Sequence, residues 1–201
     1  MEKPAETQYP IHDLLQRRWS PRAFSERAVG PDTLRSLWEA ARWAASCFNE
    51  QPWSFIVAMK EDPKEFSRLL SCLVEGNITW AQHAPVLMVS VAKTHFDQDG
   101  SPNPHAWHDV GQATANLTVQ ATALGLFVHQ MAGILPGKIR ELYQIPDQYE
   151  PVAGIALGYS GNPDQLPDKL RQRELGKRTR KSMAEFVFAG RWAQTSTIAK
   201  G

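Results

Sequence analysis

One long stretch in the middle of the chain constrains the fold more than any other feature. Its apolar positions recur at the spacing of an α-helix: Trp107, Val110, Thr114, Leu117, Ala121 and Leu124. Glycine and alanine fill many of the positions between them, and such small side chains let a second helix approach closely. We therefore expect the longest helix here, at the centre of the domain or of a dimer interface.

Helical and strand patterns alternate along the rest of the chain. Apolar spacing and helix-start signals predict helices near 11–15 and over 31–44, 63–73 and 136–143. Short apolar runs predict strands over 54–59, 85–92, 126–131 and 151–157. Small, polar and Gly/Pro-rich stretches predict loops over 45–53 and 97–104 and a helix end at 75–77. This alternation is typical of both α+β and α/β folds.

Length and charge narrow the class of protein. The 201 residues, 42% of them hydrophobic, suit one domain spanning 1–201 with a real core. The net charge of +1 gives no bulk attraction to nucleic acid or membrane, and no apolar run is long enough to span a bilayer. The polar start has no signal-peptide core, and two cysteines make no disulfide framework. We expect a cytoplasmic protein.

The segment Arg17-Arg18-Trp19-Ser20-Pro21-Arg22 is the most distinctive polar feature. Pro21 breaks any helix here, so the arginines project from a bend. Arginine is the preferred side chain for bidentate recognition of phosphate or carboxylate. An anion clamp and a solvated basic turn are both compatible with these residues alone.

The sequence lacks the common motifs for nucleotide binding, metal binding and nucleophilic catalysis. It contains no phosphate-binding P-loop, Rossmann fingerprint, Cys-x-x-Cys, His-Glu-x-x-His or Gly-x-Ser-x-Gly. His95, His105 and His108 indicate surface histidines rather than metal ligands, and nothing near Cys47 marks it as a nucleophile. What remains is arginines near both ends of the chain, with amide side chains between them. This set suits a ligand with a phosphate and a polar heterocycle that itself carries redox chemistry.

Two stretches near the N-terminus resemble the paired signature of the FMN-dependent nitroreductase family. They are residues 18–24, Arg-Trp-Ser-Pro-Arg-Ala-Phe, and residues 45–53, Ala-Ser-Cys-Phe-Asn-Glu-Gln-Pro-Trp. Three later stretches, 84–87, 123–126 and 178–181, also look like the family, in the right order. The resemblance covers nearly the whole chain.

The resemblance implies an α+β fold with a central, mostly antiparallel sheet flanked by helices. It also implies a homodimer with intertwined arms and two FMN sites at the subunit interface. By position, Arg18, Ser20 and Arg22 would hold the phosphate, ribityl chain and pyrimidine edge of FMN, with Arg178 and Arg180 completing the phosphate clamp.

Further contacts to the flavin follow from the same resemblance. Ser46, Cys47 and Asn49 would reach it from the partner subunit, and Asn77 would contact the polar edge of the ring. Met131, Ala132 and Gly133 would place a backbone N–H against the ring, where a preorganised donor stabilises negative charge. Arg22 would stabilise the same charge through Coulombic attraction.

The chain also departs from the family pattern. Trp19 stands where a basic residue is usual, and Ala45 stands where many members have proline. Residues 93–107, which tend to shape the substrate pocket, carry no pattern that transfers. Phe48, Phe96 and Trp107 are candidates to stack on a flat substrate, whereas we expect Phe127 to pack in the core.

The activity implied by the resemblance is a two-step exchange. NADH or NADPH would reduce FMN by hydride transfer and leave, and a nitroaromatic or quinone would then take the electrons in the same pocket, which predicts ping-pong kinetics. Two alternatives remain open: a flavoenzyme specialised for one metabolite, and a flavin-binding sensor or carrier without turnover. A nucleic-acid patch at 169–181 is disfavoured, because it lacks interleaved aromatic residues.

Overall fold

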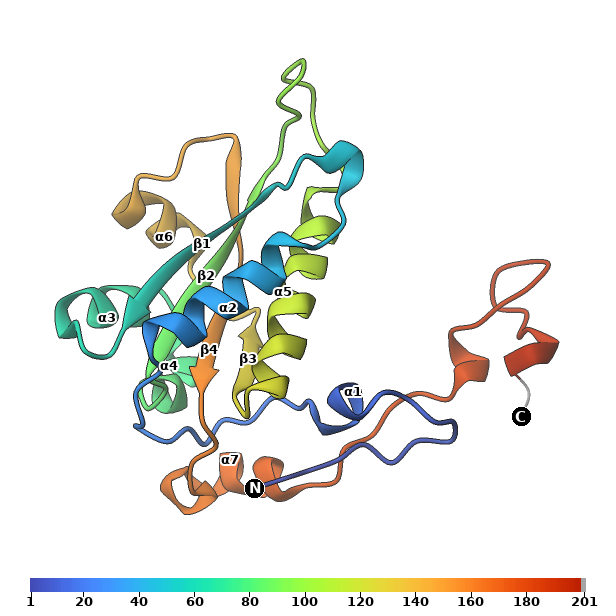
Figure 1. Ribbon diagram of the computed structural model, residues 1–201, viewed down its shortest axis with the longest axis horizontal. Helices are drawn as coiled ribbons and strands as arrows, with labels where there is room; N and C mark the ends of the chain where they lie inside the picture. The colour runs from blue at the N-terminus through green and yellow to red at the C-terminus, as the bar shows by residue number, and fades with distance from the viewer. Residues whose placement is uncertain (200–201) are drawn as a thin grey trace.

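A computed structural model describes residues 1–199. Its centre is a four-stranded sheet in the order β1-β2-β4-β3, with every neighbouring pair antiparallel (Figure 1). The strands are β1 (Trp53–Met59), β2 (Val86–Lys93), β3 (Phe127–Met131) and β4 (Tyr149–Gly158). The α+β prediction with an antiparallel sheet is confirmed.

Seven α-helices and four short 3₁₀ helices surround the sheet in the described chain. The α-helices are α1 (Asp13–Arg17), α2 (Pro31–Arg42), α3 (Pro63–Leu70), α4 (Glu75–Ala81), α5 (Ala106–Ala123), α6 (Pro136–Tyr143) and α7 (Asp168–Leu175). The 3₁₀ helices are η1 (Cys47–Asn49), η2 (Pro163–Gln165), η3 (Met183–Glu185) and η4 (Thr197–Ala199). The predicted long helix is confirmed as α5, the longest element.

Helices cover both faces of the sheet, because successive residues of a strand point to opposite faces. In β2, Val86 and Met88 join one core with apolar residues of α2 and α5. Leu87 and Val89, which alternate with them, join a second core with residues of α3, α4 and α6. Residues 86–89 of β2 are therefore apolar toward both faces, as the sequence pattern indicates.

Two helices do not follow the sequence-based predictions. The helix predicted over 63–73 ends at Leu70, and a new helix, α4, begins where residues 75–77 were expected to end one. Burial of Trp80 against the core favours helix there despite Gly76. Helix α7 was missed because its one buried residue is Glu174, so the helix has no buried apolar stripe.

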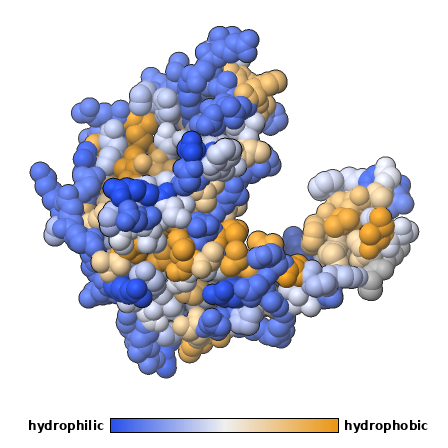
Figure 2. All heavy atoms as spheres, viewed as in Figure 1, coloured by the Kyte–Doolittle hydropathy of each residue, from blue (hydrophilic) through white to orange (hydrophobic). Residues whose placement is uncertain are grey.

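The C-terminal arm, residues 183–199, extends away from the body (Figure 1). Its hydrogen bonds beyond Phe186 are formed within the arm, as between Ser196 and Val187. Trp192 and Ile198 are 88% and 90% exposed, and apolar surface is visible on the arm in Figure 2. The burial that these apolar residues require is thus not found within one copy of the chain.

Beyond the end of β4, the chain runs against the segment that follows the arginine bend. The Gly161 N–H donates to the carbonyl of Ala23 at 2.8 Å, and Phe24 and Ser160 form an isolated antiparallel bridge. A Cβ atom on Gly161 would lie 2.5 Å from the backbone carbon and oxygen of Phe24. Only glycine allows this approach, which fixes the exit of the arginine bend.

We expect Gly161→Ala to lower the free energy of unfolding by about 1–3 kcal/mol, because two stretches of backbone must separate to admit the methyl group. Urea denaturation measures the change. Gly137→Ala is the matched control: Gly137 is exposed in α6 with nothing within 4 Å of its Cβ position, so a gain of up to about 1 kcal/mol is expected. Equal effects of the two substitutions would contradict the close approach.

No helix among residues 1–199 is both long and apolar enough to cross a membrane.

Candidate functional site

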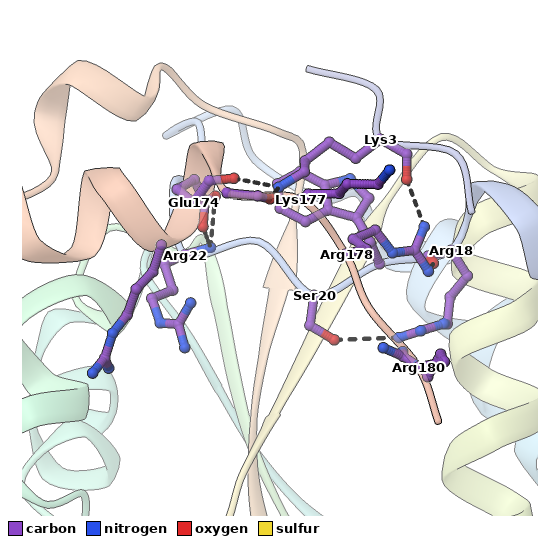
Figure 3. Close-up of a pocket in the computed structure, with 11 residues that line it drawn as sticks. Lys3, Arg18, Ser20, Arg22, Glu174, Lys177, Arg178 and Arg180 are labelled. Carbon is purple, nitrogen blue, oxygen red and sulfur yellow. Dashed lines mark hydrogen bonds between the residues drawn. The ribbon is translucent and has the colours of Figure 1, made fainter. Parts of the chain in front are cut away.

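A strongly basic pocket of about 210 Å³ lies between the arginine bend, the N-terminal segment and α7 (Figure 3). Its cationic side chains are Lys3, Arg18, Arg22, Arg173, Lys177, Arg178 and Arg180. One hydroxyl, that of Ser20, and one carboxylate, that of Glu174, also line it. The pocket thus brings together the residues of the arginine bend and of the C-terminal basic motif that were predicted to hold FMN, namely Arg18, Ser20, Arg22, Arg178 and Arg180.

The arginines of the pocket lie in two groups. Arg18, Arg178 and Arg180 gather on the side of Ser20, where Arg18 Nη1 donates to Ser20 Oγ at 3.3 Å (Figure 3). Arg22 lies beside Glu174 at the other end of the pocket. This separation would let one elongated ligand meet cationic groups at both ends.

The pKa values of two arginines reflect crowding of like charges. Burial lowers the pKa of Arg18, and the nearby charge of Arg180 lowers it further. Burial likewise lowers the pKa of Arg178, with additional contributions from Arg18 and Arg180. Arginine nevertheless stays protonated in proteins. The cluster is therefore self-repelling, and a bound anion would relieve that repulsion.

Arg178 organises the backbone around the pocket. Its guanidinium donates to the carbonyl oxygens of Lys3, Gln16 and Arg18. The ammonium of Lys3 in turn donates to the carbonyls of Glu174 and Gly176 at the end of α7. These contacts join three distant parts of the chain into one wall.

Trp19, which departs from the family pattern, packs beneath this wall. The Lys3 ammonium lies 5.1 Å from the centre of its ring, and Phe127 meets the ring edge-on at 6.0 Å. A lysine from the N-terminal segment thus brings positive charge next to the position where the family has a basic residue. Sequence reasoning missed Lys3, because no local pattern connects it to the arginine bend.

The peptide group between Pro21 and Arg22 is held from both sides. Its N–H donates to Glu174 Oε1 and Oε2 at 2.9 and 3.0 Å, and its carbonyl accepts from His129 Nδ1 at 2.8 Å. The Ala23 N–H adds a bond to Glu174 Oε1 at 3.1 Å. Neither Glu174 nor His129 was predicted as a site residue from the sequence.

A second group of predicted residues meets at the end of β3. Asn77 of α4 donates through Nδ2 to the carbonyl of Gly133 at 3.0 Å, and the Val74 N–H bonds the same oxygen at 3.1 Å. A Cβ on Gly133 would lie 2.6 Å from Asn77 Nδ2. The turn Met131–Gly133 and Asn77 therefore form one close-packed unit.

A third group, Ser46, Cys47 and Asn49, lies in the loop around η1. The Cys47 N–H donates to Asp109 Oδ2 at 3.0 Å, which attaches the loop to the first turn of α5. Asn49 has a φ of 60°, and its neighbours Phe48 and Gln51 have φ values of 50° and 49°, a left-handed conformation that non-glycine residues adopt at a cost. Strain of this kind persists where the surrounding structure enforces it, and it is common at functional sites.

This loop does not meet the arginine pocket within one chain. It joins the N-terminal end of α5, whereas Lys3 and Arg17 lie beside Thr122 and Leu126 at the helix's other end. Eighteen helical residues at 1.5 Å each separate the two ends by about 27 Å.

The candidate substrate residues lie beside the same loop. Phe48 and Phe96 meet edge-on with ring centres 5.9 Å apart, and Trp107 is partly exposed in the first turn of α5. Phe127 packs against the core, as expected from the sequence. Within residues 1–199, no three His, Cys, Asp or Glu side chains come together in a way that could hold a metal ion.

The buried His129 side chain predicts how the free energy of unfolding depends on pH. Burial lowers its pKa from the ordinary 6.5 to about 4; the bond to the Pro21 carbonyl opposes this, and the charge of Arg22 adds to it. Between pH 6.5 and 4 the unfolded chain therefore binds a proton that the folded chain does not. The free energy of unfolding should fall across this window as pH falls, by up to about 3 kcal/mol from this residue.

His129→Asn should remove that contribution. Urea denaturation at pH 7 and pH 4.5, with and without the substitution, isolates it from the titration of carboxylates. The loss of stability on acidification should be smaller in the variant. Identical losses in the two proteins would show that His129 is not held neutral.

Comparison with known proteins agrees with this fold. The sequence profile of the nitroreductase family matches residues 15–159. An uncharacterised 15.4 kDa protein of Mycolicibacterium smegmatis is 31% identical over 127 residues, covering 63% of this chain and 84% of that protein. An FMN reductase [NAD(P)H] of Bacillus subtilis is 24% identical over 81% of this chain and 70% of its own length.

A solved structure provides a further likeness. The crystal structure of an oxidoreductase containing FMN superposes with a TM-score of 0.87 at 36% identity, covering 94% of this chain and 96% of that one. Fold, profile and relatives together define an oxidoreductase enzyme. The chain belongs to the nitroreductase family, which confirms the family predicted from the sequence.

Proposed function

We propose that this chain is an FMN-dependent oxidoreductase that passes electrons from NADH or NADPH to electron-poor acceptors such as nitroaromatics and quinones. The observation that carries the proposal is the basic pocket, in which seven cationic side chains surround one hydroxyl and one carboxylate. The FMN in the structure that is 36% identical, and the name of the Bacillus subtilis relative, support it.

The residues present fit the phosphate of FMN in charge. A self-repelling arginine cluster suits a phosphate dianion, and Gly133 lets Asn77 and the turn Met131–Gly133 pack without a side chain between them. In this proposal Arg18, Arg178 and Arg180 hold the phosphate and Ser20 holds the ribityl chain.

Other residues would act on the ring. Arg22 would lie at the pyrimidine edge and Asn77 at a polar edge. When bound, FMN supplies two-electron redox chemistry. A backbone N–H of the turn Met131–Gly133 and the guanidinium of Arg22 would stabilise the negative charge that reduction adds, since both are held in place before the charge develops.

We propose that the chain, a single domain over 1–201, acts as a homodimer in the cytoplasm. Tyr9, Ile11 and Leu15 expose apolar surface on the N-terminal side of a hollow of about 600 Å³, and Phe186 of the C-terminal arm lines the same hollow. A second copy with its own arm would cover this surface. It would also bring the partner's loop at Ser46, Cys47 and Asn49 to the flavin, which the 27 Å length of α5 prevents within one chain. Sedimentation velocity should show a species of twice 22.6 kDa, and a monomer would contradict the dimer.

Steady-state kinetics test the proposed activity. One open pocket must admit NAD(P)H and the acceptor in turn, so double-reciprocal plots against NADPH at several fixed benzoquinone concentrations should be parallel. The side chains of Phe48, Phe96 and Trp107 would contact the acceptor. Intersecting lines would contradict the shared pocket, and an absence of turnover with bound FMN would favour a sensor or carrier.

A further inference from the structure

The peptide group between Pro21 and Arg22 is the most strongly held part of the arginine bend. Two side chains that are far away in the sequence bond its two ends: Glu174 accepts from the N–H, and His129 donates to the carbonyl. The bend itself offers no regular secondary structure that would fix this peptide. Its orientation therefore depends on Glu174 and His129.

Glu174 is unusual among the acidic residues. It is 2% exposed, and Asp109 is the one other buried acidic residue in the part of the chain that the structure describes. A buried carboxylate is costly unless hydrogen bonds compensate it. Both carboxylates accept hydrogen bonds from backbone N–H groups of loops predicted to contact FMN. Glu174 accepts from Arg22 and Ala23, and Asp109 accepts from Cys47.

His129 completes the arrangement from the opposite side. A carbonyl oxygen only accepts, so Nδ1 carries the proton and the ring is fixed in one tautomer. The ring is wedged against Trp80 at a centroid distance of 4.5 Å, which sets its orientation. The His129 N–H is therefore held in place against the Pro21 carbonyl.

We propose that Glu174 and His129 are positioning residues that clamp the Pro21–Arg22 peptide and so aim the Arg22 guanidinium at the bound flavin. The inference rests on the proposed FMN function. Neither side chain touches the cofactor in this account. Their effect on binding passes through the backbone of Arg22.

Charge and positioning predict opposite results for Glu174→Gln. A carboxylate that lines an anion pocket repels a phosphate, so removing its charge alone should tighten FMN binding. Glutamine keeps an oxygen that can stand in for Oε1 but places an NH2 group at Oε2, which cannot accept from the Arg22 N–H. Two donors then face each other, which should instead loosen the peptide and weaken binding. The sign of the change in Kd therefore separates the two roles.

Two substitutions of His129 test the other end of the peptide without a change in net charge at pH 7. His129→Asn places an amide nitrogen close to the position of Nδ1 and keeps a donor for the Pro21 carbonyl. His129→Leu has a similar size and no donor. If His129 positions the peptide, asparagine should preserve FMN binding and leucine should not. If His129 only fills space, the two variants should bind FMN equally.

The experiment is a titration of apoprotein into FMN at pH 7, followed by quenching of flavin fluorescence, with thermal unfolding of each apoprotein alongside. Glu174→Gln and His129→Leu should raise the Kd at least 10-fold, and His129→Asn should raise it less than 3-fold. Asp168→Asn, which removes an exposed carboxylate from the same helix, is the matched control and should leave the Kd unchanged.

Amide hydrogen exchange of the apoproteins gives an independent readout without flavin. The Arg22 amide should exchange at least 10-fold faster in Glu174→Gln than in the wild type, because it loses its bond to Oε2. Tighter FMN binding by Glu174→Gln would overturn the proposal, and so would equal Kd values for the two His129 variants. Each result decides alone, so if one variant fails to fold the other test still stands. Wild-type protein that binds no FMN would instead refute the proposed function, while exchange at Arg22 still decides whether the peptide is clamped.

Discussion

Replacing Arg18 and Arg22 together by alanine is expected to raise the Kd for FMN by about 10²–10⁴. These side chains reach the pocket from its two ends, so the double variant removes cationic groups from both. Hydrogen bonds to charged groups contribute about 1.5–3 kcal/mol each, and two of them correspond to this range of affinity. Equilibrium titration with FMN measures the effect.

The same double variant should not lose stability in the absence of FMN. Burial lowers the pKa of Arg18, and the nearby charge of Arg180 lowers it further, so its charge is unfavourable in the free protein. Removal of such a group from a binding site is typically neutral or stabilising. Arg35→Ala/Arg171→Ala is the matched control, since both arginines form exposed surface ion pairs away from the pocket. An unchanged Kd in Arg18→Ala/Arg22→Ala, or an equal loss in the control, would remove the basis for the anion site.

Trp80→Ala should lower the free energy of unfolding by about 3–5 kcal/mol, the usual cost of deleting a large buried aromatic side chain. Trp80 is 1% exposed, stacks on Phe24 with ring centres 6.2 Å apart and also contacts the ring of His129. It thus connects the end of the arginine bend to the core. Urea denaturation at pH 7 measures the loss.

Trp43→Ala is the matched control for this experiment. Trp43 is exposed at the end of α2 and contacts Glu39 and Arg42 on the surface. A change within about 0.5 kcal/mol is expected there. A similarly small change for Trp80→Ala would mean that α4 does not anchor the bend.

The parts of the fold that repeat an apolar pattern were predictable from the sequence. Helix α5 and all four strands follow such patterns, and they occur where expected. Helix α4 was not predicted, because Gly76 and Asn77 favour a helix end locally while burial of Trp80 favours helix. Helix α7 was not predicted, because its one buried residue, Glu174, carries a carboxylate and no apolar stripe results.

The candidate site also contains residues that the sequence predicts and residues that it does not. The arginines and Ser20 belong to a short local motif, so their grouping was expected, and the structure brings them into one pocket. His129 and Glu174 bond the backbone of that motif across more than 100 positions, and Lys3 reaches it from the N-terminal segment through its charge beside the Trp19 ring. Contacts of this kind leave no periodicity or spacing in the sequence, so they require the folded chain to be seen.

The most direct test of the proposed function is an absorbance spectrum of the purified protein, incubated with FMN and desalted, before and after anaerobic addition of NADPH or NADH. We predict bound flavin bands that bleach with at least one of the two donors. A protein that retains no FMN would contradict the assignment of the arginine pocket, and bound flavin that neither donor bleaches would contradict the proposed electron transfer.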